Sequence, residues 1–458
     1  MGVFMKKKLL VVVIFLIFLY GCSTKNSKDD NTISNIDNQY ENEKENDNVI
    51  TVWEDKNFEA LIRFYLNNFD KDIYINDLDN ITELTILSNL KIITNINECE
   101  IPEEYRNKIG LITSMKDIDN FNNLNKISIT GNKINYICTY KNSLNISLLD
   151  LSNNNFNYLS NIENYGNLTN LDISYNYIEN LKPLNNLTNL KSLNLSFIGP
   201  PANNIDGRDN SNIDIIDILE LTNLESIEII NSNINNISNL NKFNNLKKLI
   251  LYRCNLNIDE LYLISNNKEN KIESLQLGIA NVSGESAVLD MSKFKNLFNL
   301  KELKVWGGEA NNIGSLNNLN SLIMHFAFIS KNEDLGNLKN IKNMIIWDSE
   351  FEDTKILEVI SSLEKIEFKN TDINNLKHLK NNKNLKSITI IAGNLNDISD
   401  LKEFMDIENI IVPINNITDV SVFSNLQKLK KIDISNNPVI NYEVVDSLKN
   451  NKEIEIIK

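Results

Sequence analysis

Apolar side chains recur along this chain with a period of 22 residues. In one unit, Leu168, Leu171 and Ile173 are followed by Asn176, and the same order of positions begins again at Leu190. The alternation around Leu171 and Ile173 predicts a short strand in which these two side chains point inward and their neighbours point outward. The wider apolar spacing after the asparagine predicts a return segment of 3₁₀ turns or extended chain.

The period extends over most of the chain. Its first position falls at Leu124, Ile146, Leu168 and Leu190, at Leu224 and Leu246, and at Leu319, Ile341, Leu363, Leu385, Ile407 and Leu429. Less regular units begin near Ile81, Arg106, Ile272 and Leu300, and Ile454 and Ile456 predict a closing strand. A period of 20 to 29 residues with this pattern predicts a leucine-rich repeat solenoid, of about sixteen full repeats over residues 81–458.

The predicted fold class is therefore α/β. We expect a right-handed superhelix with a parallel sheet on its concave face and 3₁₀ or extended segments on its convex face. A unit of 22 residues is too short for a strand and a long α-helix, so the convex side should be thin. Because one unit buries too little apolar surface to offset its own ordering, neighbouring units must stack and the ends need covers.

The asparagine position of the repeat changes along the chain. It holds asparagine at Asn89, Asn132, Asn154, Asn176, Asn415 and Asn437. Across the centre it holds Ile198, Ser232, Cys254, Ala280, Gly308, Ala327, Ser349, Thr371 and Gly393. This amide usually bonds the backbone of the turn, so we expect looser turns in the central repeats. Cys254 is expected to be a buried structural residue.

Residues 49–80 predict an N-terminal cap. Apolar residues follow a helical spacing at Phe58, Leu61, Ile62, Tyr65, Leu66 and Phe69. The segment resembles the cap of internalin-type proteins at Trp53, Asp55, Asn57, Phe58, Glu59, Ala60, Ile62, Arg63, Leu66, Ile75, Asp77, Leu78, Ile81, Thr82, Leu84 and Ile86. The resemblance covers nearly everything from Val52 onward, although the chain has no wall-sorting motif or immunoglobulin-like module after the repeats. It implies adhesion or recognition of a host protein.

Residues 1–21 predict an export signal, with Lys6 to Lys8 before an apolar run from Leu9 to Leu19. The sequence that ends at Cys22 resembles the lipobox of bacterial lipoproteins, in which the cysteine is lipidated, although Tyr20 departs from that motif. The alternatives are a plain secretory signal or an uncleaved anchor. Residues 22–48 are polar and predict a disordered tether. We therefore expect the chain to be lipid-anchored in the bacterial cell envelope and exposed on its outer surface.

Charge and motifs exclude several classes of function. The formal charge is −15, which disfavours nucleic acid as a partner. The two histidines, His325 and His378, have no companion zinc, nucleophile or phosphate-loop motif. We therefore expect no catalytic residues, metal or cofactor. The insertion at residues 199–212, which contains two prolines, is expected to be a surface loop or, as the alternative, a contact loop.

The outward positions of the central strands predict a binding surface. One such position holds Tyr252, Gly278, Trp306, His325, Trp347 and Lys369 in consecutive repeats, and the same region of the face includes Arg253, Lys304, Ile323, Phe326, Ile345, Asp348 and Glu367. Exposed aromatic and isoleucine side chains rimmed by charge are typical of a binding patch. The alternative is that curvature or a loop buries them. The N-terminal half has only polar residues there and is expected to be a solvated face.

We therefore expect a monomeric protein that binds a protein or peptide on its concave face. Two alternatives remain open at this stage. One is an envelope-assembly or structural role in the same cell. The other is a glycan or small-ligand receptor, since Trp306 and Trp347 could stack on sugar rings.

Overall fold

The computed structural model describes residues 49–199, 211–279, 288–330, 335–451 and 454–458. The chain divides into Met1–Asn48 and Val49–Lys458, and only the second unit is described. The predicted signal peptide (1–21), the tether (22–48), the lipidation site Cys22 and most of the 199–212 insertion lie outside the described residues. They stay predictions.

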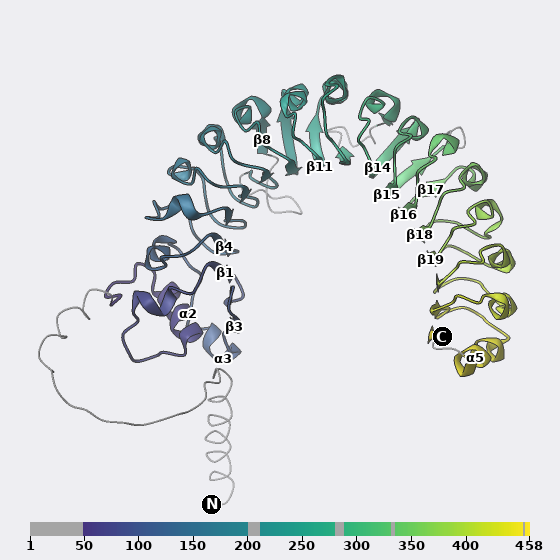
Figure 1. The fold of residues 1–458 in the computed structure, drawn as a ribbon, viewed down its shortest axis with the longest axis horizontal. Helices are drawn as coiled ribbons and strands as arrows, with labels where there is room; N and C mark the ends of the chain where they lie inside the picture. Colours follow the sequence, from purple (N-terminus) through teal and green to yellow (C-terminus); the bar gives the residue numbers. More distant parts are fainter. Residues whose placement is uncertain (1–48, 200–210, 280–287, 331–334, 452–453) are drawn as a thin grey trace, which may run out of the picture. The chain divides into compact units, whose positions relative to one another are not determined.

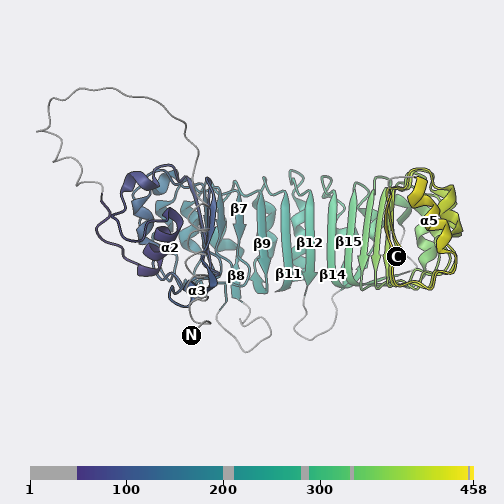
Figure 2. The ribbon, with the colours of Figure 1, turned by 90° about the horizontal axis from the view of Figure 1, so that it is seen from below.

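The second unit is an arc of stacked coils that confirms the predicted solenoid (Figure 1). Strands line its inner side, and short helical turns line its outer side. Figure 2 shows the strands side by side in one sheet. The parallel ladder contains, in order, β1 (Glu83–Leu87), β4 (Lys126–Thr130), β5 (Leu148–Asp150), β6 (Asn170–Asp172), β7 (Ser192–Asn194), β9 (Ser226–Ile230), β11 (Lys248–Leu256), β12 (Ser274–Ile279), β14 (Glu302–Asn311), β15 (Ser321–Ile329), β16 (Asn343–Trp347), β18 (Lys365–Lys369), β19 (Ser387–Ile391), β20 (Asn409–Ile411), β21 (Lys431–Asp433) and β22 (Glu455–Ile457).

The convex side is built mainly from 3₁₀ turns, as the repeat length predicts. They are η3 (Ile75–Leu78), η4 (Lys116–Asn120), η5 (Ser143–Asn145), η6 (Ile162–Asn164), η7 (Lys182–Asn186), η8 (Ile215–Ile218), η9 (Ile237–Lys242), η10 (Leu263–Asn266), η11 (Met291–Phe294), η12 (Ile313–Ser315), η13 (Leu335–Asn337), η14 (Thr354–Val359), η15 (Lys377–Leu379), η16 (Ser399–Glu403) and η17 (Ser421–Asn425). One α-helical turn, α4 (Ile258–Tyr262), precedes η10.

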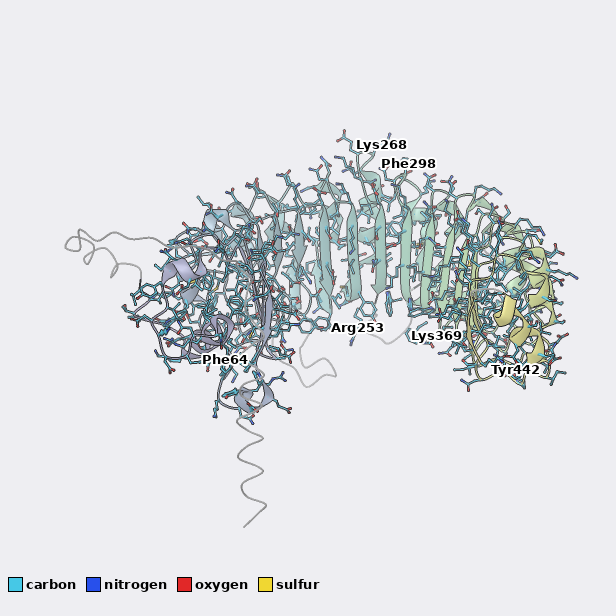
Figure 3. The ribbon with its side chains drawn as sticks, turned by 60° about the horizontal axis from the view of Figure 1, so that its bottom comes forward. Phe64, Arg253, Lys268, Phe298, Lys369 and Tyr442 are labelled. Atoms are coloured by element: carbon cyan, nitrogen blue, oxygen red, sulfur yellow. The ribbon has the colours of Figure 1, made fainter. Side chains whose placement is uncertain are left out.

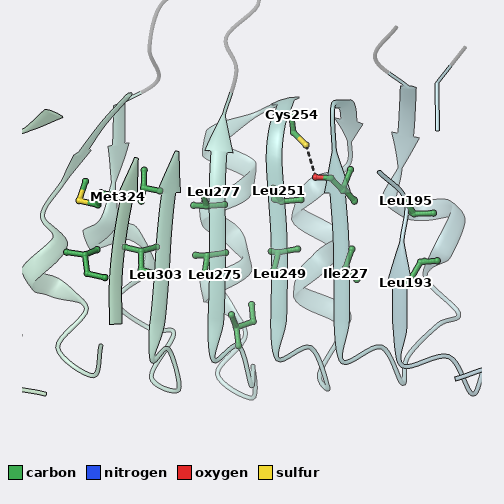
Figure 4. Close-up of a cluster of buried hydrophobic side chains, with 14 of the residues drawn as sticks. Leu193, Leu195, Ile227, Leu249, Leu251, Cys254, Leu275, Leu277, Leu303 and Met324 are labelled. Atoms are coloured by element: carbon green, nitrogen blue, oxygen red, sulfur yellow. Dashed lines mark hydrogen bonds between the residues drawn. The ribbon is translucent and has the colours of Figure 1, made fainter. Parts of the chain in front are cut away.

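The core is one continuous column of aliphatic side chains between the two sides. Parallel pairing places equivalent residues in register, for example Leu171 beside Leu193. Figure 4 shows the two inward positions of each strand forming two rows along the stack. Both inward side chains of β11, Leu249 and Leu251, are fully buried. Each repeat therefore completes the core of its neighbours, as expected for a solenoid.

Toward the two ends of the array, five of the six predicted asparagines bond the backbone of the turn as expected. The expectation for Asn89 is wrong, because this residue lies exposed in the turn between β1 and β2. The Asn176 side chain accepts a bond from the Phe156 amide and donates to the carbonyl oxygens of Leu151, Ile173 and Ser174. Asn154, Asn415 and Asn437 each make an equivalent set of bonds to the backbone. These side chains join the turns of consecutive repeats.

The expectation of looser central turns is wrong. The longest strands are central, with nine residues in β11, ten in β14 and nine in β15. Because the residue at the asparagine position is small there, the backbones continue to pair beyond the turn, as Gly308 does with Ala327. Four short strands take part in this pairing beyond the turn, namely β8 (Ser211–Asp214), β10 (Ser232–Asn235), β13 (Val288–Asp290) and β17 (Glu350–Phe351).

Small side chains also replace the missing amide directly. The Ser349 hydroxyl accepts a bond from the Ala327 amide and donates to the Trp347 carbonyl oxygen. Cys254 is buried, as predicted, and its thiol donates to the carbonyl oxygen of Ile229 (Figure 4). Burial raises the pKa of this thiol to about 12, so it stays protonated.

A second set of asparagine side chains joins neighbouring repeats, central ones included, although Lys271 replaces the asparagine in the repeat that begins at Ile272. The asparagine that precedes the first leucine of a repeat donates from Nδ2 to a carbonyl oxygen of the previous repeat. This bond is 2.8 Å for Asn223 to Thr188 and 2.8 Å for Asn318 to Phe298, and it recurs at Asn167, Asn189, Asn245, Asn299 and Asn340. We did not predict these bonds from the repeat pattern.

The N-terminal cap contains the predicted helix. α2 (Lys56–Leu66) buries Phe58, Leu61 and Ile62 against the first coils. Phe69 lies beyond the helix and is exposed. An antiparallel pair of strands, β2 (Lys91–Thr94) and β3 (Glu98–Glu100), then extends from β1.

The repeat expected near Arg106 is wrong. That residue ends the short helix α3 (Glu103–Arg106), and β1 pairs directly with β4. This segment adds no strand to the parallel ladder, so our count of full repeats is one too high. At the other end, the predicted closing strand is β22, which pairs with β21. A helix that we did not predict, α5 (Tyr442–Asn451), covers the core before it.

Candidate functional site

The predicted aromatic positions form one row across the middle of the concave face. We call Tyr252, Trp306, His325, Trp347 and Lys369 the aromatic stripe. Strand register places Trp306 beside His325, His325 beside Trp347, and Trp347 beside Lys369. β11, β14, β15, β16 and β18 therefore bring together side chains that are up to 117 residues apart (369 − 252) in the sequence.

The rings of the stripe contact one another. The Tyr252 and Trp306 ring centroids lie 5.0 Å apart, those of Trp306 and His325 lie 4.2 Å apart in a stacked arrangement, and those of His325 and Trp347 lie 4.7 Å apart edge to face. Such geometries are favoured by about 0.5–1.5 kcal/mol per pair beyond the area they bury. The stripe is therefore preorganised.

Gly278 makes the stripe continuous. It lies between Tyr252 and Trp306 in the register, and it has no side chain to separate them. A Cβ atom at this position would lie 2.3 Å from Cδ2 of Tyr252 and 3.0 Å from Cβ of Trp306. The Tyr252 ring therefore lies over the glycine and reaches Trp306.

Two lysines add positive charge to the tryptophans. Lys304 Nζ lies 4.5 Å from the ring centroid of Trp306, and Lys369 Nζ lies 5.5 Å from that of Trp347. Both distances are in the cation–π range. Trp347 also donates a 3.1 Å bond from Nε1 to the carboxylate of Glu367. Lys304, Ile323, Ile345 and Glu367 form the neighbouring outward row on the same strands.

The stripe is less exposed than we expected. Trp306 and Trp347 are half-buried and lie on β14 and β16, so β15 separates them and they are not on adjoining strands. His325 of β15 is only 4% exposed between them. Burial and the nearby Lys304 lower the pKa of His325, whereas Asp348 and Glu367 oppose that shift. The imidazole is therefore neutral at pH 7.

The remaining predicted residues lie at the turn that ends these strands. Arg253, Phe326 and Asp348 have φ of 54°, 53° and 49°, because each occupies the left-handed position before the small residue of the turn. Phe326 is 62% exposed. Figure 3 shows Arg253 and Lys369 at one edge of the sheet and Lys268 and Phe298 at the opposite edge.

A groove that the sequence did not reveal lies beside this turn. It has a volume of about 610 Å³, and its lining includes Val288, Glu309, Phe326, Phe328 and Glu350. The strands that pair beyond the asparagine position form this groove, because Val288 pairs with Glu309, Glu309 with Phe328, and Phe328 with Glu350. The alternation of residues after the asparagine position would have predicted these outward side chains, had we expected strands there.

The side chains on the N-terminal half of the concave face are less exposed and more hydrogen-bonded than the solvated surface we expected. Ser128 donates to Asp150, and Asn194 donates to Asp172 across neighbouring strands. Ser174 and Ser196 are buried. Burial raises the pKa of Asp172, and its hydrogen bonds oppose that shift.

Within the described part of the chain, no group of three or more histidine, cysteine, aspartate or glutamate side chains could hold a metal ion. His378 contacts Glu358 at 2.7 Å from η15 to η14, away from the aromatic stripe. Among the described helices, none has the length and apolar character needed to cross a membrane.

Comparisons with known proteins agree on the fold. No protein-family model and no curated protein matches the chain. A solved internalin (inlF) from Listeria monocytogenes is similar, with 19% identity and a TM-score of 0.51 over 88% of this chain and 95% of that one. A leucine-rich repeat protein of Leptospira interrogans is similar too, with 20% identity and a TM-score of 0.51 over 76% and 93%. The fold is a leucine-rich repeat solenoid. The solenoid presents its aromatic stripe at the centre of the concave face.

Proposed function

We propose that this chain is a lipid-anchored protein of the bacterial cell surface that binds a protein or peptide through the aromatic stripe. The single observation that supports this most strongly is the preorganised row of rings in the middle of the concave face, in which Tyr252, Trp306 and Trp347 are half-buried around the buried His325. Tryptophan, tyrosine and charged side chains with this mixture of burial and exposure are typical of the residues that dominate binding energies. Adhesion or recognition of a host protein is one use of such a surface.

Ring contacts within the stripe argue against the glycan alternative. A sugar ring stacks on an open aromatic face. Trp306 already contacts Tyr252, His325 and the Lys304 ammonium group, so its faces are largely occupied. The half-buried Ile323 and Ile345 of the neighbouring row add apolar surface beside the rings, which suits a protein partner better than a sugar.

Capture of a partner by the full chain tests this function. The chain is crosslinked to envelope and host-cell extracts, and the captured proteins are compared between variants. We expect Trp306→Ala with Trp347→Ala to reduce capture of the main partner by about 30-fold or more, the factor that corresponds to a loss of about 2 kcal/mol. Phe298→Ala at the opposite edge should leave capture unchanged. Equal capture by both variants would refute the role of the stripe.

A second variant guards against misfolding. Ile345→Glu adds a charge at a half-buried outward position and leaves the ring contacts in place, so it should also block capture. Thermal melting of each variant shows whether the solenoid is intact.

The anchor and the location require separate measurements. Cys22→Ala should stop incorporation of a labelled fatty acid and release the chain from membranes. Protease added to intact cells should remove the repeat domain if it faces outward. Resistance to protease with intact labelling would favour the envelope-assembly alternative.

A further inference from the structure

The groove beside the aromatic stripe combines apolar and acidic side chains in alternation. Its central row runs Val288, Glu309, Phe328 and Glu350 on β13, β14, β15 and β17. Val288 is 52% exposed and Phe326 at the groove edge is 62% exposed. Such exposure of large apolar side chains marks contact surfaces in soluble proteins.

Among the residues that the structure describes, the carboxylates of the groove lack the ion pairs that the carboxylates at the opposite edge of the sheet form. There, lysine and glutamate alternate between repeats and pair across them, as in Glu225 with Lys247 at 2.6 Å and Glu364 with Lys342 at 3.0 Å. Within the described residues, Glu309 and Glu350 form no ion pair, and Asp348 accepts one bond from the neutral Asn370 amide. The groove therefore has negative charge that the described part of the chain does not compensate.

The groove is continuous with the aromatic stripe. Trp306, His325 and Trp347 each precede the turn that leads into it, and Asp348 and Phe326 lie at that turn. A partner seated on the stripe would reach the groove without crossing other elements. Its 610 Å³ volume is enough for a few side chains.

We propose that this groove takes a basic, apolar segment of the protein partner, in which lysine or arginine alternates with aliphatic or aromatic residues. The inference rests on the proposed function and names the chemistry of that partner. Basic side chains would meet Glu309, Asp348 and Glu350, while the apolar ones would pack on Val288, Phe326 and Phe328. Complementary charge of this kind gives register and specificity.

The chain's own tether does not have this chemistry. Residues 23–48 contain seven acidic residues against three lysines, and their few apolar residues do not alternate with basic ones. Negative charge would be repelled by the groove. The occupant is therefore expected to come from another molecule.

Peptide binding to the full chain tests this inference. Three labelled nonapeptides are compared by fluorescence anisotropy: one alternates lysine and leucine, one alternates glutamate and leucine, and one alternates lysine and serine. We expect only the lysine–leucine peptide to bind well, and we expect its affinity to fall as salt is raised. Glu309→Gln with Glu350→Gln should weaken it at least tenfold.

The control removes the same charge elsewhere. Glu220→Gln with Glu269→Gln changes two exposed carboxylates outside the groove, so it corrects for attraction to an acidic protein as a whole. Equal weakening by the two double variants, or equal binding of the lysine–serine or glutamate–leucine peptide, would overturn the proposal. Failure of the aromatic stripe would instead appear as unchanged partner capture in the tryptophan variant, whatever the peptides do.

Discussion

At the residue scale, the candidate site depends on the missing side chain of Gly278 as well as on the aromatic rings. Gly278 is the one member of the outward row that lets Tyr252 reach Trp306. A side chain there would separate β11 from the rest of the stripe. The glycine therefore determines whether the row of rings is continuous from β11 to β14.

Gly278→Ala tests this dependence. The added Cβ would overlap the Tyr252 ring, which must move away from Trp306. We expect a loss of about 1–3 kcal/mol in the free energy of unfolding, measured by urea denaturation, because the packed site has no space for the methyl group. Weaker partner capture should accompany it. An unchanged free energy of unfolding would contradict the packing described for Tyr252.

His325 gives the stripe a pH dependence. Its folded pKa is lowered, mainly by burial, so below about pH 6.5 the unfolded chain binds a proton at this residue more readily than the folded chain does. The contribution of the neutral imidazole to stability is thus present at pH 7 and lost as the pH falls.

Thermal melting between pH 8 and pH 5 measures this effect. The melting temperature of His325→Gln should fall less over this range than that of the unchanged protein, because glutamine does not titrate. Parallel pH profiles for the two proteins would show that His325 is protonated equally in both states.

At the element scale, two sets of asparagine side chains, which we call ladders, join neighbouring repeats by hydrogen bonds to the backbone. The first is strong toward the ends, where residues such as Asn176 are fully buried with four backbone bonds. The second is more exposed and includes central repeats, as at Asn318, with one interruption at Lys271. The central strands lose the first ladder and gain direct backbone pairing in its place.

Alanine variants should separate the two ladders. Asn176→Ala leaves several buried backbone groups without a partner, so we expect a loss of about 2–4 kcal/mol in the free energy of unfolding. Asn318→Ala exposes its freed carbonyl to water and should cost about 0.5–1.5 kcal/mol. Urea denaturation of both variants checks the order, and a larger loss for Asn318→Ala would reverse our account of the ladders.

The N-terminal cap depends on Asp55. Its carboxylate accepts bonds from the Asn57 and Phe58 amides at the start of α2, and it also holds the Thr113 and Ser114 amides of the first coil. Burial alone would raise the pKa of Asp55, but these bonds outweigh it and the pKa is lowered. This contribution to stability is present above about pH 3.9 and is lost as the pH falls through the lower folded pKa.

Replacing this residue should open the cap. Asp55→Ala removes both the helix cap and the link to the first coil, so we expect a loss of about 2 kcal/mol, at the upper end for such caps. Limited proteolysis should then cut near α2 before the repeats unfold. The same cleavage rate in both proteins would show that other contacts hold the cap.

Much of the fold could be predicted because each repeat applies the same constraint. Inward leucines such as Leu171 and Leu193 follow from spacing alone, and the outward row of Trp306 and Trp347 follows from them. The groove could not be predicted in this way. Its strands form because Gly308 and Ala327 allow close backbone pairing, which depends on neighbours in other repeats.

The cap at the other end shows the same limit. α5 has polar residues among its apolar ones, and its role becomes clear only where it covers the last coil. The non-strand segment near Arg106 interrupts the period locally, and the direct pairing of β1 with β4 is a long-range contact that spacing does not encode.

At the scale of the whole molecule, the repeat domain is an arc with its strands on the inner side (Figure 1). The aromatic stripe lies on β11, β14, β15, β16 and β18 in the middle of that inner sheet. The polar N-terminal strands and the central stripe lie on one continuous face, so a partner of sufficient size could contact both. Our central claim is that the stripe and its groove make the energetically important contacts.

Photocrosslinking in cells tests that claim most directly. A photoreactive phenylalanine analogue is placed at Tyr252, Ile345 and Phe326 and, as controls, at the exposed apolar residues Leu144, Tyr158 and Ile440. The account predicts one common partner crosslinked from the first three positions and from none of the controls. Crosslinks to that partner from the controls alone would contradict it.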